Sequence, residues 1–230
     1  MSTIASPPSR HTRRPLLGPH AHGRRFRWNQ YIEAVDNGDY VEGCRFELSR
    51  GILVVEWFNM SDVANPWHAY VIHRVRRLLT AWDLANPGRV EMIGGGGETR
   101  VVVPITESDR HPDIALYAVA PPADDSRAWW NWPPELAVEV VSPGSSVRDH
   151  EEKPPEYLAY GVGEYWVLDP DHPDRSGPAA RVFTRNASGD AWEDRWEEGV
   201  VTSERFPGLA VPVAEVLAPR PTPPDGPAAA

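Results

Sequence analysis

The sequence predicts an α/β fold: a central mixed β-sheet flanked by helices, with additional β-strands. Two observations predict this class. Helical and strand-like hydrophobic periodicities alternate through the middle of the chain. The 230 residues, 41% of them hydrophobic, also suffice for one well-buried core. Because the middle of the chain shows no internal repeat and no second shift in composition, we expect a single domain.

The two ends of the chain differ in composition from the middle. Residues 1–24 are rich in Pro, Arg and His and lack periodicity, so we expect a disordered basic leader. It contains no apolar segment typical of a secretory signal. Residues 219–230, PRPTPPDGPAAA, are expected to form a similar tail. The folded domain should therefore span residues 25–218.

The first half of this domain predicts two helices and a hairpin. A helix fits Trp28 to Asn37 and ends at Gly38. The segment RFELSRGILVVEW contains two strand-like pieces around Ser49–Gly51, which predicts a β-hairpin. Residues Pro66 to Asn86 have apolar side chains at three- and four-residue spacing and precede a Pro-Gly pair, which predicts a long helix.

The second half is richer in strands. Gly94–Gly97 lacks the Lys-Ser/Thr of a phosphate-binding loop, so it is interpreted as a turn. One helix is expected at residues 148–160. Strands are expected at residues 89–93, 99–103, 113–119, 136–142, 164–169, 181–184 and 191–196.

Charge and cysteine content narrow the function classes. A net charge of −10 argues against tight, non-specific nucleic-acid binding, which needs Lys and Arg. However, residues 10–27 carry six arginines and no acid, so this segment is either an arm that contacts phosphates or a solvated tail. The single cysteine, Cys44, excludes an internal disulfide and fits a cytoplasmic location. No apolar stretch is long enough to span a membrane.

Two carboxylates stand in apolar strands. Glu139 interrupts LAVEVVS, and Asp113 opens the strand in HPDIALYAV. An unpaired buried carboxylate is costly, so each needs a cation, hydrogen bonds or an exposed edge. If the strands are neighbours, the two carboxylates converge and suit Mg²⁺, which prefers oxygen ligands. Taken singly, Asp113 could instead cap a turn, and Glu139 could face water.

Lys153 is the only lysine among 23 Lys and Arg residues. Lysine can orient a water molecule, help to deprotonate it or neutralise a phosphoryl group, whereas arginine cannot act as a base. The alternative is a solvent-exposed lysine among acidic neighbours. Pro154 and Pro155 follow directly, so either a helix restarts at Pro154 with Lys153 at its cap, or the lysine is displaced from the site.

The string VEVVSPGSSVRDHEEKPPEYLAYGVGEYWVLDP, with FELSRG before it and FPGLAVPVAEVL after it, resembles the Uma-type family of restriction endonucleases. This family is part of the PD-(D/E)XK nuclease superfamily, and the resemblance covers roughly residues 26–217. It implies a restriction-endonuclease-like fold with the metal site at one end of the sheet. The implied metal ligands are Asp113, Glu139 and the carbonyl of Val140. The implied catalytic residues are Asp113, Glu139, Lys153 and Glu47, with Glu47 in the metal or water network and Lys153 supplied by the following helix.

Three functions from different classes follow. The first is a Mg²⁺- or Mn²⁺-dependent endonuclease that hydrolyses phosphodiester bonds of DNA, for which a symmetric homodimer would suit double-strand cleavage. The second is a catalytically inactive nuclease-fold module that binds nucleic acid or a protein partner. The third is a metal-dependent hydrolase of a small phosphoester. The histidines do not predict a zinc site, because His68 and His73 lie five residues apart rather than four.

Overall fold

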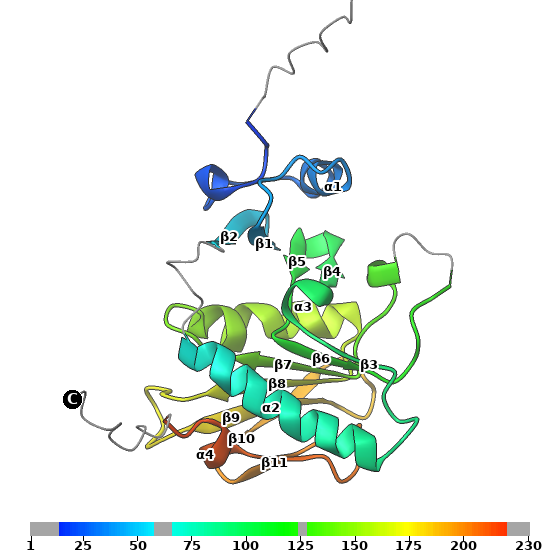
Figure 1. The fold of residues 1–230 in the computed structure, drawn as a ribbon, viewed down its shortest axis with the longest axis vertical. Helices are drawn as coiled ribbons and strands as arrows, with labels where there is room; N and C mark the ends of the chain where they lie inside the picture. Colours follow the sequence, from blue (N-terminus) through cyan, green and yellow to red (C-terminus); the bar gives the residue numbers. More distant parts are fainter. Residues whose placement is uncertain (1–13, 58–65, 124–127, 220–230) are drawn as a thin grey trace, which may run out of the picture.

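The computed structural model describes residues 14–57, 66–123 and 128–219. Figure 1 shows a central sheet with helix α2 (Pro66–Ala85) lying across one face. A second, smaller sheet lies toward the N-terminal end of the molecule, beyond helix α3 (Lys153–Tyr160). The predicted α/β class with a mixed sheet is confirmed.

The central sheet has six strands in the order β10-β9-β8-β7-β6-β3. Only β7 and β8 run parallel, and the other neighbours are antiparallel, so the sheet is mixed. The β7–β8 connection contains α3, as a parallel crossover requires. The strands are β3 (Met92–Gly94), β6 (Ile114–Tyr117), β7 (Leu136–Val140), β8 (Glu164–Asp169), β9 (Ala179–Arg185) and β10 (Trp192–Glu197).

Alternation along β7 decides which way the candidate carboxylate points. Leu136, Val138 and Val140 belong to the core cluster that contains the buried face of α2. Ala137 belongs to the cluster on the opposite face, together with Tyr157 of α3. Because side chains alternate along a strand, Glu139 lies on the α3 face.

The second sheet has the order β2-β1-β5-β4. The predicted hairpin is confirmed, with Ser49 opposite Ile52 and a turn at Arg50 and Gly51, whose φ angles are 50° and 78°. Helix α1 (Trp28–Asp36) packs on this sheet, at the predicted position. The strands are β1 (Cys44–Ser49), β2 (Ile52–Trp57), β4 (Val101–Val103) and β5 (Ser108–Arg110).

Part of the expected disordered leader is folded. Leu17 and Ala21 are fully buried in the α1–hairpin cluster, and the backbone of Leu17 bonds to that of Val41. The expectation of disorder is therefore wrong for residues 14–24, because a few apolar side chains between prolines suffice to cover the hairpin. Residues 1–13, with Arg10 and Arg13 of the basic arm, and the tail from residue 220 lie outside the described residues.

The remaining elements are short. The strands β11 (Val200–Thr202) and β12 (Ala210–Pro212) form a hairpin that continues into α4 (Val213–Val216), and these were not predicted. A π-helical turn, η5 (Arg148–Glu152), precedes α3. None of the helices in the described ranges combines the length and apolarity needed to cross a bilayer. The 3-10 turns are η1 (Pro19–Ala21), η2 (Gly96–Glu98), η3 (Pro104–Thr106) and η4 (Ala128–Trp130).

Candidate active site

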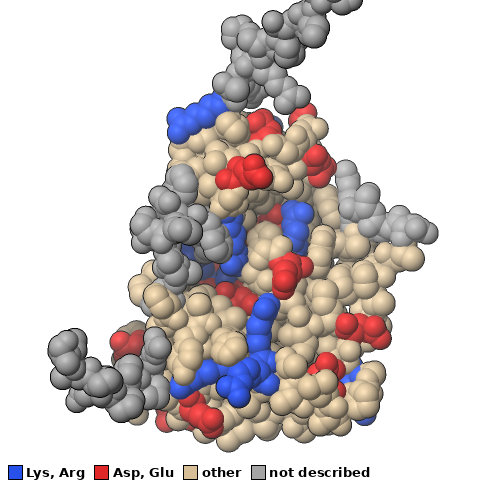
Figure 2. Space-filling view, viewed as in Figure 1, with Lys and Arg blue, Asp and Glu red and all other residues tan. Residues whose placement is uncertain are grey.

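One small cavity brings together every residue that the sequence singled out for chemistry. Its volume is about 70 Å³, and it lies where β1, the start of β6, the end of β7 and the η5–α3 segment meet. The face of the molecule seen in Figure 2 has a hollow across its middle, with both basic and acidic side chains around it. The predicted residues that line the cavity are Glu47, Asp113, Glu139, Val140 and Lys153.

Asp113 and Val140 are joined directly, because β6 and β7 are antiparallel neighbours. The Val140 backbone N–H donates to Asp113 Oδ2 at 2.9 Å. His68 Nε2, from the first turn of α2, lies 3.0 Å from Asp113 Oδ2 and 2.9 Å from the Val140 carbonyl oxygen. The carboxylate and the carbonyl therefore converge on one point, which the imidazole of His68 contacts.

Glu139 and Lys153 form a buried ion pair. Lys153 Nζ lies 2.8 Å from Glu139 Oε1 and 2.8 Å from Asp149 Oδ1. The Tyr157 hydroxyl donates to Glu139 Oε1 at 2.5 Å, and the Ser145 hydroxyl donates to Asp149 Oδ2 at 2.6 Å. The lysine is thus held between two carboxylates, on the side of the cavity formed by the η5–α3 segment.

The electrostatics of the cavity are dominated by excess negative charge. Burial, with the charges of Asp113 and Asp149, raises the pKa of Glu139 to about 8 against the lowering effect of Lys153. Burial would also raise the pKa of Asp113, but the hydrogen bond and charge of His68 lower it on balance. The pKa of Glu139 stays raised although Lys153 contacts it, so another cation would stabilise its ionised form further.

The two prolines after Lys153 shape the segment that carries it. Pro154 lacks the N–H that would bond to the His150 carbonyl, and that carbonyl accepts a bond from Arg181 Nη1 at 3.2 Å instead. The Lys153 N–H bonds back to the Arg148 carbonyl, as in a π turn. The prolines occupy the first turn of α3, where they are tolerated. The structure therefore has the first of the two arrangements considered above, with Lys153 at the helix start and directed to the carboxylates.

Glu47 completes the cavity from the second sheet. Its Oε1 accepts the His111 backbone N–H at 2.8 Å, and its Oε2 lies 3.7 Å from Arg110 Nη1. Burial would raise the pKa of Glu47, but the charges of Lys153 and Arg110 lower it to about 2. Glu47 is therefore ionised, and its side chain is fixed beside the other carboxylates.

Sequence reasoning missed several members of the cavity. The spacing of His68 and His73 argued only against zinc. No signal in the sequence linked His68 to Asp113 or Val140, which follow it by 45 and 72 positions. Asp149 lies in the string that resembles the Uma-type family, but the resemblance assigned it no role. His111 also lines the cavity.

Oxygen donors make the cavity suitable for a hard divalent cation. Asp113, Glu139 and the Val140 carbonyl offer the ligand types that Mg²⁺ and Mn²⁺ take. The described residues hold one other group of metal-ligand type, formed by His150, Asp169 and His172, whose ligand atoms lie within 4.8 Å of one another. There the His150 Nε2 bonds to Asp169 Oδ2 at 2.9 Å.

Comparisons with known proteins give a structure of similar fold and the family of the chain. The fold belongs to the α/β class with a central mixed sheet. It is similar to a crystal structure from Anabaena variabilis ATCC 29413 described as a "putative nuclease belonging to DUF820", with a TM-score of 0.59 and 13% identity over 84% of this chain and 97% of that one. The chain belongs to the Uma2 family, described as "Putative restriction endonuclease", whose family model matches residues 28–214. No curated protein matches it.

Proposed function

We propose that this protein is a Mg²⁺- or Mn²⁺-dependent endonuclease that hydrolyses phosphodiester bonds of DNA. One observation carries the proposal: Asp113, Glu139, the Val140 carbonyl, Lys153 and Glu47 line a single buried cavity. Membership of a family described by restriction endonuclease activity supports the same conclusion.

The donor set fits the metal by charge as well as by ligand type. Asp113, Glu139 and the Val140 carbonyl would hold the ion. The pKa of Glu139 is raised by burial and by neighbouring carboxylates despite Lys153, and a bound cation would oppose both effects. When bound, a divalent ion polarises the scissile phosphate and lowers the pKa of the attacking water.

The protein's own groups then have separate roles. Lys153 Nζ, fixed between Glu139 and Asp149, would donate to the phosphate oxygen or to the attacking water and steady the developing charge. Glu47 would accept a hydrogen bond from water in the cavity, because it is ionised at neutral pH.

Calorimetric titration of Mn²⁺ into the wild type and Glu139→Gln tests the metal site. Replacement of the carboxylate by an isosteric amide should abolish binding at the cavity, because one charged ligand is lost. Since the His150 group could also take Mn²⁺, the titration is repeated in a His172→Ala background. Binding that persists unchanged in Glu139→Gln with His172→Ala would contradict the proposed ligands.

A non-catalytic module that binds nucleic acid or a protein partner is the second candidate, and His68 favours it. Its Nε2 contacts both the Asp113 carboxylate and the Val140 carbonyl, so the imidazole must turn away or join the ligands when metal binds. No Mn²⁺ binding in the folded wild type would favour this second function.

A further inference from the structure

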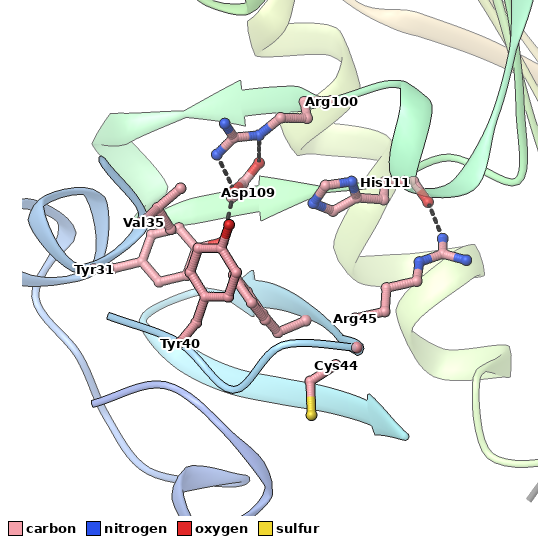
Figure 3. A pocket seen from close by; sticks show the side chains of 11 residues that line it. Tyr31, Val35, Tyr40, Cys44, Arg45, Arg100, Asp109 and His111 are labelled. Atoms are coloured by element: carbon pink, nitrogen blue, oxygen red, sulfur yellow. Dashed lines mark hydrogen bonds and ion pairs between the residues drawn. The ribbon is translucent and has the colours of Figure 1, made fainter. Parts of the chain in front are cut away.

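The cavity that contains Asp113, Glu139 and Lys153 is called the acidic cavity below. A larger pocket adjoins it on the side of the second sheet. Its volume is about 530 Å³, within the range of small-molecule sites. Figure 3 shows Tyr31, Tyr40 and Val35 on one side of it, with Arg45 and His111 on the opposite side. We call it the aromatic pocket.

The aromatic pocket and the acidic cavity share two residues. Arg45 and His111 line both, and Arg45 Nη2 donates to the His111 carbonyl at 3.2 Å. Arg45 also precedes Glu47 by two residues on β1, and the His111 N–H bonds to Glu47. A group in the aromatic pocket is therefore separated from the carboxylates only by this Arg45–His111 boundary.

The walls combine aromatic rings with cationic side chains. The rings of Tyr40 and Phe46 lie 5.5 Å apart, and 39% of Tyr40 is exposed, so its ring is accessible. Arg100 binds Asp109 on the far wall, and Tyr31 donates to the same carboxylate at 2.7 Å. The one acid of the pocket is thereby paired with Arg100, and Arg45 is the second arginine that lines the pocket.

One ring nitrogen on the His111 side of the pocket lacks a hydrogen bond among the described residues. This atom, His111 Nδ1, is buried. In Figure 3 the His111 ring points toward the pocket. His111 therefore contributes a flat ring to the wall of the pocket, beside Arg45.

We propose that the aromatic pocket takes one unstacked nucleobase of the substrate, whose adjoining phosphate lies at the carboxylates. Aromatic faces stack on any base, and Arg45 at the boundary matches the phosphodiester charge. A base within a duplex is stacked between its neighbours, so its face can reach an aromatic ring of the pocket only after the base leaves its stack. The preferred substrate is therefore a single strand or a locally opened duplex. This inference rests on the proposed nuclease function.

Fluorescence anisotropy in Ca²⁺, which takes the same kind of oxygen ligands as Mg²⁺, tests it with two labelled probes. One is a six-residue oligothymidylate, and the other is a fully abasic strand of equal length and charge. The wild type should bind the oligothymidylate at least about five-fold more tightly, the lower end of the range for stacking of one base. Tyr40→Ala should remove this preference and leave affinity for the abasic strand unchanged.

Two control variants test whether the effect depends on the aromatic ring of Tyr40 and whether the loss of a tyrosine elsewhere disturbs the fold. Tyr40→Phe keeps the aromatic face, so it should retain the preference for bases. Tyr70→Ala removes a tyrosine of α2 that lies outside the pocket and should behave as the wild type. Equal binding of both probes by the wild type, or an unchanged preference in Tyr40→Ala, would overturn the base pocket but not the nuclease. Failure to bind either probe would instead contradict a nucleic-acid substrate, and with it both proposals.

Discussion

Glu139 shows how one side chain sets the character of the cavity. It lies in a strand whose other four residues are apolar, on the face opposite α2, and only 3% of it is exposed. Desolvation favours its protonated form, and three neighbouring carboxylates add to this effect. Its ionised form is therefore stable only beside cations, of which Lys153 is one and a bound divalent ion would be the other.

Lys153→Ala separates metal binding from catalysis. We expect cleavage of DNA in Mg²⁺ to fall by about 100-fold or more, the usual effect of removing one donor that stabilises transition-state charge. Mn²⁺ should bind at least as tightly as in the wild type, because a neighbouring cation has been removed. Cleavage assays and calorimetry measure the two quantities.

The fold of Lys153→Ala is compared by circular dichroism with Mn²⁺ present, because without metal two buried carboxylates lose their counter-ion. Lys153→Met is the matched control for side-chain volume and should lose the same activity. Undiminished cleavage by a folded variant would refute the assigned role.

At the scale of elements, the contact between the second sheet and α3 depends on buried charge. Arg110 of β5 is fully buried, and its Nε donates to Glu156 Oε2 of α3 at 2.7 Å. It also lies near Glu47 and Glu152. Arg110 therefore links helix α3 to strand β5, which is the neighbour of the strand that carries Glu47. This link fixes one wall of the cavity.

Arg110→Met should destabilise the protein by about 3–5 kcal/mol, because removal of one partner leaves buried carboxylates uncompensated. Arg50→Ala is the matched control. Arg50 pairs with the same Glu156 at 3.3 Å, but its side chain is 52% exposed, so we expect a loss of about 1 kcal/mol or less. Urea unfolding measures both free energies, and equal losses would show that burial does not decide the strength of these pairs.

Elements with strong local patterns were predictable from the sequence. The period of α2, the apolar runs of β7 and β8 and the turn at Gly51 each depend on neighbouring residues, and the structure has them at the expected positions. By contrast, β5 is the three polar residues Ser108–Arg110. Arg110 is buried because it pairs with Glu156, 46 positions later. Asp109 is buried because it accepts from Arg100 nearby and from Tyr31, 78 positions earlier. Such non-local compensation leaves no periodicity to detect.

The candidate site was predictable to a similar degree. Carboxylates within apolar strands, and a single lysine, stand out from their neighbours in short stretches of the sequence. These residues do line one cavity. His68 could not be found in this way, because only the packing of α2 on the sheet brings its first turn to Asp113. The aromatic pocket likewise depends on α1 meeting β1 and β5.

For the whole molecule, the overall charge opposes binding of nucleic acid. With 33 acidic and 23 basic residues, the protein repels a polyanion at long range, and attraction must come from a few cations near the cavity. Arg45 and Lys153 are two of them, at the boundary and inside the cavity. The substrate should therefore contact few phosphates, in contrast to proteins with a broad basic surface.

The salt dependence of binding measures how many phosphates the protein neutralises. In Ca²⁺, with oligothymidylate and 50–200 mM KCl, the logarithm of the binding constant should fall against the logarithm of salt concentration with a slope of about −2. This value corresponds to about three phosphates at roughly −0.7 each for a single strand. Removal of residues 1–13, which include Arg10 and Arg13, should leave the slope unchanged if the cations near the cavity supply the attraction. A slope steeper than about −5 that becomes shallow after this truncation would instead assign phosphate binding to the basic arm.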